Sequence, residues 1–185
     1  MLIDPLAPPA GTPDHERFWQ ALDGEVRRRG APVAVLLSTD WHDRSAQAVF
    51  DRYHASVGAT ICAPAVCVPA GSSGGLECRP THTFHEGEPL PGGTEAYLAE
   101  WNPEVLIYLP RPRALFVADS LWSPPDAAEG EVCLTQDRVR PVLRRVLEAR
   151  RVDVELLSHG RPVREHAHEV LTRVLEQPTR PPWGE

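Results

Sequence analysis

The sequence predicts an α/β fold in which helices cover strands that pair mainly in parallel. A continuous apolar run at residues 33–37 is typical of a strand buried on both faces of a sheet. Residues 15–29 carry apolar side chains at helical spacing, which indicates an amphipathic helix. Strand and helix patterns alternate over the first 63 residues, and this order implies parallel pairing with right-handed crossovers.

The elements of the first half are bounded by turn and cap residues. The apolar segment at 1–6 contains Asp4-Pro5 and predicts a short strand that runs into a turn. The helix over 15–29 is expected to have Asp14 as its N-cap and to end at Gly30, which follows three arginines. The other elements expected here are a strand at 33–37, a helix at 45–56 and a strand at 58–63.

The second half is expected to contain a hairpin and two helices. Apolar runs at 104–109 and 114–118 flank Arg-Pro-Arg and predict a hairpin, and 137–150 has helical spacing. The other expected elements are a Gly/Ser/Pro-rich loop at 69–80, a strand with tight turns at 84–93, a strand at 94–101, a loop at 120–130, a strand at 154–157 and a helix at 164–176. We expect a single domain over 1–177 and a Pro-rich tail at 178–185.

The composition favours a cytoplasmic protein that binds neither nucleic acid nor membrane. Apolar residues make up 42% of the 185 residues, which is enough for a packed core. No apolar run approaches the ~20 residues of a membrane helix, and the N-terminus lacks the pattern of a signal peptide. The formal charge of -7 argues against nucleic acid as a partner.

The cysteines are expected to be buried thiols in a reducing compartment. They form no C-x-x-C pair, and no Cys/His spacing fits a zinc finger. The four are Cys62, Cys67, Cys78 and Cys133. A disulfide between Cys78 and either Cys62 or Cys67 remains the alternative.

Polar residues follow the apolar run at 33–37 directly. The segment Ser-Thr-Asp-Trp-His-Asp-Arg-Ser at 38–45 resembles the Thr-His-x-His-x-Asp-His motif of the metallo-β-lactamase superfamily. In a residue-by-residue alignment, Asp40 replaces the first His, and His42 matches the second. Arg44 replaces the Asp, and Ser45 replaces the last His.

Further segments carry the same resemblance in the family's order. Ile3-Asp4-Pro5 is similar to the family's strand that ends in Asp, and Gly58 to Pro64 to the strand after the motif helix. Gly93, in Pro-Gly-Gly-Thr, stands where the family has a ligand His. Asp119 ends a strand like the one that carries the metal-bridging Asp, and His159 lies in a segment similar to His-Gly-x-Pro-Val.

The resemblance implies a metallo-β-lactamase-like αββα sandwich. Family members build their first sheet partly from strands that precede the Asp-Pro turn, whereas Met1 stands just before that turn here. We therefore expect a shortened N-terminal sheet. An exposed sheet edge promotes association, so we also expect a homodimer, or a partner that covers the edge.

The same resemblance implies at most one metal ion. The family holds two zinc ions, whereas four ligands remain here: Asp40, His42, Asp119 and His159. Gly93 has no ligand atom, and the fixed charge of Arg44 opposes a second dication. The expected cofactor is therefore either none or one divalent ion, with zinc as the first expectation.

Two functions follow. The first is a metallo-β-lactamase-like protein of unknown specific role that has lost dinuclear zinc hydrolysis, binds a small anionic ligand, and pairs Arg44 with Asp40 or Asp119. The alternative is a mononuclear metal-dependent hydrolase of a small anionic ester or phosphoester. Its catalytic residues would be Asp40, His42, Arg44 and Asp119, with Arg44 orienting the substrate.

Overall fold

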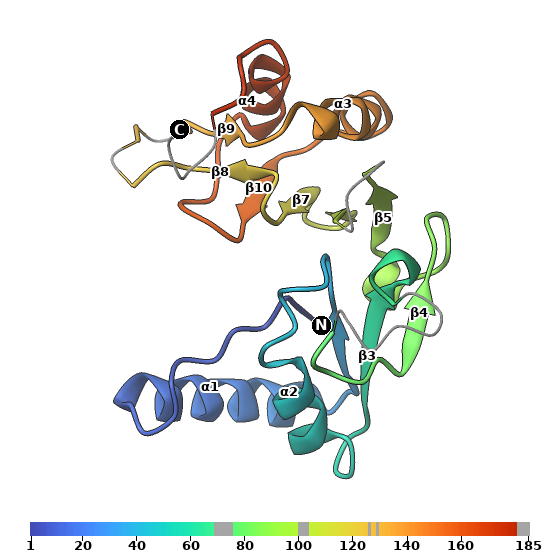
Figure 1. Cartoon of the computed structure of the whole chain (residues 1–185). Coiled ribbons are helices and arrows are strands. Elements are labelled where there is room, and N and C mark those ends of the chain that lie inside the picture. The colour runs from blue at the N-terminus through green and yellow to red at the C-terminus, as the bar shows by residue number, and fades with distance from the viewer. Residues whose placement is uncertain (69–75, 100–103, 126, 129, 181–185) are drawn as a thin grey trace. The chain divides into compact units, whose positions relative to one another are not determined.

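The computed structural model describes residues 1–68, 76–99, 104–125, 127–128 and 130–180 (Figure 1). The chain divides into two compact units, Met1–Phe84 and His85–Glu185, which we call the first and second units. Several predicted segments fall partly outside the described residues: 69–75 of the loop, 100–101 of the strand at 94–101, 126 and 129 of the loop at 120–130, and 181–185 of the tail. The single domain over 1–177 stays a prediction.

The first unit contains a parallel four-stranded sheet with the order β1-β2-β3-β4. Its strands are β1 (Leu2–Ile3), β2 (Val33–Leu36), β3 (Ala59–Pro64) and β4 (His82–Phe84), its helices are α1 (Pro13–Arg29) and α2 (Ala46–Tyr53), and the 3-10 turn η1 (Ala65–Cys67) follows β3. The predicted parallel alternation is confirmed. The strand predicted at 84–93 was wrong, because the strand ends at Phe84 and Gly87 lies in a turn with φ 86°.

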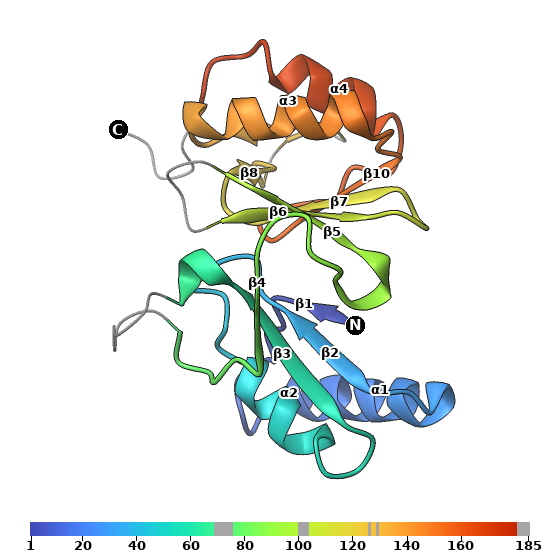
Figure 2. The ribbon, with the colours of Figure 1, turned by 90° about the vertical axis from the view of Figure 1, so that its right-hand side faces the viewer.

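Both helices of the first unit cover one face of its sheet (Figure 2). Alternate side chains of β2 and β3, such as Val35 and Ile61, pack in one apolar cluster with Val49 of α2 and Leu22 of α1. The polar motif residues lie at the carboxyl ends of the strands, with Asp4 after β1 and residues 38–45 after β2.

Helix α1 begins two residues earlier than predicted. Thr12 is its N-cap, since the Thr12 hydroxyl accepts a 3.2 Å hydrogen bond from the backbone N–H of His15. Asp14 as N-cap was wrong, because Pro13 occupies the first helical turn, where its fixed φ and missing N–H suit the helix. Gly30 ends the helix as predicted, with φ 59°.

The second unit contains a mixed sheet with the order β10-β7-β6-β5. Its strands are β5 (Glu95–Leu98), β6 (Val105–Leu109), β7 (Ala114–Val117) and β10 (Val154–Leu157), and the separate pair is β8 (Leu121–Trp122) with β9 (Cys133–Leu134). The predicted β6–β7 hairpin is confirmed as antiparallel, and β10 pairs with β7 in parallel. The loop predicted at 120–130 missed β8, which is too short to show a period.

Two helices cover one face of the mixed sheet (Figure 2). They are α3 (Arg140–Ala149), preceded by the 3-10 turn η3 (Asp137–Val139), and α4 (Ala167–Val174). Helix α4 starts later than the predicted 164, because the left-handed backbone of His166 (φ 55°) precedes its first turn. The apolar cluster beneath the helices includes Leu115, Val146 and Leu171.

All four cysteines are free thiols, and Cys62, Cys67 and Cys78 are buried as predicted, whereas Cys133 is partly exposed. The alternative disulfides to Cys78 are therefore not formed. Burial, with the nearby charge of Asp43, raises the pKa of the Cys78 thiol to about 12. Among the helices of the described residues, none is long and apolar enough to cross a membrane.

Candidate functional site

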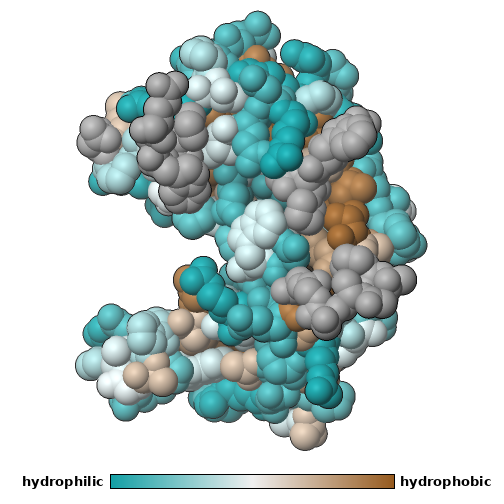
Figure 3. All heavy atoms as spheres, viewed as in Figure 1, coloured by the Kyte–Doolittle hydropathy of each residue, from teal (hydrophilic) through white to brown (hydrophobic). Residues whose placement is uncertain are grey.

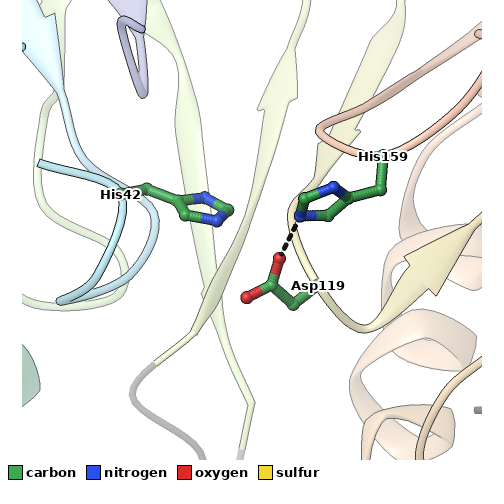
Figure 4. A group of neighbouring side chains, drawn as sticks. All are labelled: His42, Asp119 and His159. Atoms are coloured by element: carbon green, nitrogen blue, oxygen red, sulfur yellow. Dashed lines mark hydrogen bonds and ion pairs between the residues drawn. The ribbon is translucent and has the colours of Figure 1, made fainter. Parts of the chain in front are cut away.

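Two predicted metal ligands lie together in the second unit. Asp119 follows β7 and His159 follows β10, and because these strands are parallel neighbours, both residues emerge at the same edge of the sheet. The Nε2 atom of His159 lies 2.9 Å from Oδ1 of Asp119 (Figure 4). The side chains of His159 and Asp119 are 52% and 22% exposed, so solvent reaches both groups.

A buried carboxylate supports the Asp119 loop from below. Glu104 is fully buried and accepts hydrogen bonds from Ala118 N (3.1 Å), Ser120 N (3.3 Å) and Ser120 Oγ (2.6 Å). Burial raises the pKa of Glu104 to about 7, although the bonds from Ser120 favour the charged form. Because these donors flank Asp119, Glu104 fixes the backbone that carries it. Our sequence interpretation missed this role; a Glu that opens an apolar strand was the available signal.

The loop of His159 depends on a glycine. Gly160 has φ 104°, and a Cβ atom there would lie only 2.9 Å from Ser123 N. The backbone N–H of Ser123 donates to the carbonyl of His159 at 3.1 Å, which joins this loop to the end of β8. The segment after His159 therefore needs a residue without a side chain.

His42 is held by a carboxylate of its own unit. Nδ1 of His42 donates to Oδ2 of Asp4 at 3.1 Å, and the two side chains are 9% and 5% exposed. Oδ1 of Asp4 accepts from the backbone N–H of Ser38 at 2.8 Å, and the Ser38 hydroxyl also donates to Asp4. Asp4 thus fixes the orientation of the His42 ring (drawn in Figure 4), as outer carboxylates do for metal-binding histidines.

The remaining motif residues take separate roles. Asp40 is partly exposed and accepts a long hydrogen bond of 3.4 Å from Thr39 Oγ1. Arg44 is exposed, and within the described part of the first unit no ion pair joins it to Asp40. The Ser45 hydroxyl accepts from Ala7 N at 2.9 Å, so Ser45 serves the loop structure. Gly93 is exposed and has φ 72°.

Asp43 is a structural residue that the sequence interpretation did not single out. It is buried, and its Oδ2 accepts from the backbone N–H of Cys78 at 2.7 Å. Its backbone carbonyl accepts from Ala46 N at 2.8 Å, at the start of α2. The motif loop is therefore anchored on both sides of His42, by Asp4 and by Asp43.

Comparison with solved structures identifies the fold. No protein-family model and no curated protein matches the sequence. A metallo-beta-lactamase from Pontibacter korlensis is similar, with a TM-score of 0.59, 17% identity, and coverage of 91% of this chain and 79% of that chain. A flavodiiron protein from Giardia intestinalis has a TM-score of 0.56 and 16% identity over 94% of this chain and 47% of that chain.

A beta-lactamase domain protein from Burkholderia ambifaria is also similar, with a TM-score of 0.54 and 16% identity over 90% of this chain and 61% of that chain. At such identities the similarity establishes the fold and not the activity. The mixed α/β architecture predicted from the motif segments is confirmed, and the chain has the metallo-β-lactamase fold.

Proposed function

We propose that this protein is a mononuclear metal-dependent hydrolase, with a metallo-β-lactamase fold, that acts on a small anionic ester or phosphoester. The observation that carries the proposal is the pair formed by Asp119 and His159, whose Oδ1 and Nε2 atoms lie 2.9 Å apart. In a tetrahedral zinc site with bonds of about 2.0–2.1 Å, neighbouring ligand atoms lie roughly 3.3 Å apart. The pair is shorter than this because it is hydrogen-bonded, and a small outward shift of the two side chains would let both atoms bind one ion.

The chemistry of the other candidate ligands fits the same ion. The motif assigns His42 and Asp40 as further ligands, and imidazole nitrogen with carboxylate oxygen suits zinc, manganese or iron. The bond from His42 Nδ1 to Asp4 supports this assignment, because metal-binding histidines usually donate their other ring nitrogen to an outer carboxylate. When bound, such an ion would supply Lewis-acid chemistry and lower the pKa of a bound water.

The protein's own residues would bind the substrate and hold the ligands in place. Arg44 presents an exposed guanidinium, and a guanidinium can contact a carboxylate or phosphate through two N–H groups. Glu104 and Asp4 would keep Asp119 and His42 oriented, through the hydrogen bonds that they accept.

A second ion is not part of the proposal. Gly93 offers no ligand atom, Arg44 carries a positive charge, and the Ser45 hydroxyl is engaged by Ala7 N. These three residues stand where the family places ligands. We therefore propose that dinuclear zinc hydrolysis has been lost.

A metal-free protein that binds a small anion is the second candidate. It is favoured by the fact that Asp119 and His159 satisfy each other without an ion. Against it stands Arg44, which a metal-free pocket was expected to pair with Asp40 or Asp119. Within the described part of the first unit, Arg44 makes no ion pair with Asp40.

Elemental analysis of untagged protein purified without chelator separates these candidates. We expect about one equivalent of zinc, manganese or iron per chain, lost in Asp119→Ala and in His159→Ala. His85→Ala is the matched control, because His85 is exposed and lies outside the motif segments. A metal-free wild type would favour the anion-binding protein, and two equivalents would contradict the loss of the second ion.

A further inference from the structure

Over the described part of the chain, large hydrophobic side chains are rarely exposed, and the face drawn in Figure 3 is mostly hydrophilic. Among the described residues, the exposed ones are Met1, Leu6, Trp41, Val66 and Val68. All except Met1 follow the carboxyl ends of β1, β2 and β3, which are parallel neighbours in the sheet of the first unit. They therefore emerge at one edge of this sheet, which also carries Asp40 and His42.

Contacts within the first unit bring the three loops together. Ala7, next to Leu6, donates its N–H to Ser45 of the motif loop at 2.9 Å. Cys67 lies between Val66 and Val68 and is buried. The backbone N–H of Leu37 donates to the carbonyl of Cys62 at 2.9 Å, so the loop after β3 leaves the sheet beside the motif loop.

Exposure at this edge is substantial, with values of 58% for Leu6, 45% for Trp41, 41% for Val66 and 38% for Val68. Exposed apolar side chains at one edge of a sheet offer a ligand apolar area that binding can remove from water. The motif loop adds one exposed cation, Arg44, three residues after Trp41. The surface thus combines apolar side chains with a group that binds anions.

We propose that Leu6, Trp41, Val66 and Val68 form an apolar rim that binds the acyl or aryl part of an amphiphilic carboxylate, whose head group contacts Arg44. This inference rests on the proposed function and names its substrate class, which is esters that carry a separate free carboxylate, because an esterified carboxyl group has no charge for Arg44 to bind. Hydrolysis of the ester bond by water yields an alcohol, a second carboxylate and a proton, and leaves the carboxylate at Arg44 unchanged, so an amphiphilic carboxylate without an ester bond is a substrate analogue. It can be tested as a ligand without any turnover.

The test is calorimetric titration of the full chain with 4-phenylbutyrate, compared with 4-phenylbutanol and with butyrate. We expect 4-phenylbutyrate to bind most tightly, since it alone has both the aryl group and the charge. Trp41→Ala should weaken its binding roughly tenfold, because loss of a buried aromatic contact costs about 1.4 kcal/mol or more. Val66→Ser should also weaken the binding of 4-phenylbutyrate.

Arg44→Gln should weaken the binding of 4-phenylbutyrate and leave the binding of 4-phenylbutanol unchanged. Arg28→Gln is the control, since Arg28 is an exposed arginine on α1 that pairs with Glu25. The titrations are repeated with chelator-treated protein and with Asp119→Ala. Binding that persists there supports the rim whatever the elemental analysis finds, so the rim and the hydrolase proposal can fail separately. Equal binding by wild type, Trp41→Ala and Val66→Ser, all folded by circular dichroism, would overturn the rim.

Discussion

At the residue scale, two carboxylates position the candidate ligands. Asp4 accepts from His42 and from the backbone of Ser38, and Glu104 accepts from donors on both sides of Asp119. Each carboxylate has two oxygens with several acceptor positions, so one side chain can fix a whole turn of backbone. The ligand loops are therefore held by groups that were not themselves expected to bind the ion.

Glu104→Ala should destabilise the fold by about 2–4 kcal/mol, because it leaves buried donors of Ala118 and Ser120 without an acceptor. Glu104→Gln keeps one acceptor oxygen and should cost less. Urea unfolding at pH 7 measures both, with the exposed Glu148→Gln as control. Equal stability of the wild type and Glu104→Ala would exclude the supporting role.

Burial of Glu155 predicts that the free energy of unfolding depends on pH. It is fully buried on β10, neither carboxylate oxygen has a hydrogen-bond partner among the described residues, and burial raises its pKa to about 8. The folded state therefore binds this proton more tightly than the unfolded state, in which the glutamate pKa is near its ordinary value of 4.5. Stability from this group is fully present below pH 4.5 and is lost as the pH rises toward 8.

Glu155→Leu should consequently stabilise the protein by on the order of 3 kcal/mol at pH 7 and flatten the loss of stability between pH 5 and about 8. Urea midpoints at pH 5, 7 and 8.5 give this comparison, again with Glu148→Gln as control. A Glu155→Leu protein that is less stable than wild type at every pH would show that the carboxyl group has a partner.

At the element scale, the loop after β10 approaches the end of β8 so closely that Gly160 has no space for a side chain. Gly160→Ala combines this clash with φ 104° and should destabilise the fold by about 2–4 kcal/mol. Gly24→Ala is the opposite case, since Gly24 lies inside α1 with no atom within 4 Å of the added Cβ. It should stabilise by about 0.5–1 kcal/mol. Thermal unfolding of both variants measures these changes in stability. A Gly160→Ala protein as stable as wild type would contradict the close approach of the loop to β8.

The elements with long periodic patterns were predictable from the sequence, and the short ones were not. Residues 33–37 and 137–150 carry enough apolar positions to define a strand and a helix, whereas β8 and β9 have two residues each. The N-cap of α1 was missed because Asp14 and Thr12 are both good caps, and only Pro13 decides between them. Of the candidate site, the resemblance led to Asp119 and His159, and a Glu at the start of an apolar strand was a signal for Glu104, but the long-range bond from Cys78 to Asp43 leaves no local pattern.

At the scale of the whole molecule, the candidate ligands are divided between the two units, with Asp40 and His42 in the first and Asp119 and His159 in the second. The predicted association also belongs to this scale and stays a prediction. In the first unit, β1 is an edge strand of only two residues. We expect a dimer in light scattering at micromolar concentration, and a monodisperse monomer would contradict it.

Metal binding offers a test of whether one ion uses ligands from both units. An ion that binds only the folded chain stabilises it by RT ln(1 + [L]/Kd), which is about 2.7 kcal/mol at a hundredfold excess over Kd. We expect zinc to raise the unfolding temperature of the wild type and of the exposed-site control His85→Ala. If the ion needs both units, His42→Ala and Asp119→Ala should each abolish that shift. A shift that survives His42→Ala and disappears in Asp119→Ala would confine the ion to the second unit, and would leave His42 to hold the loop with Asp4.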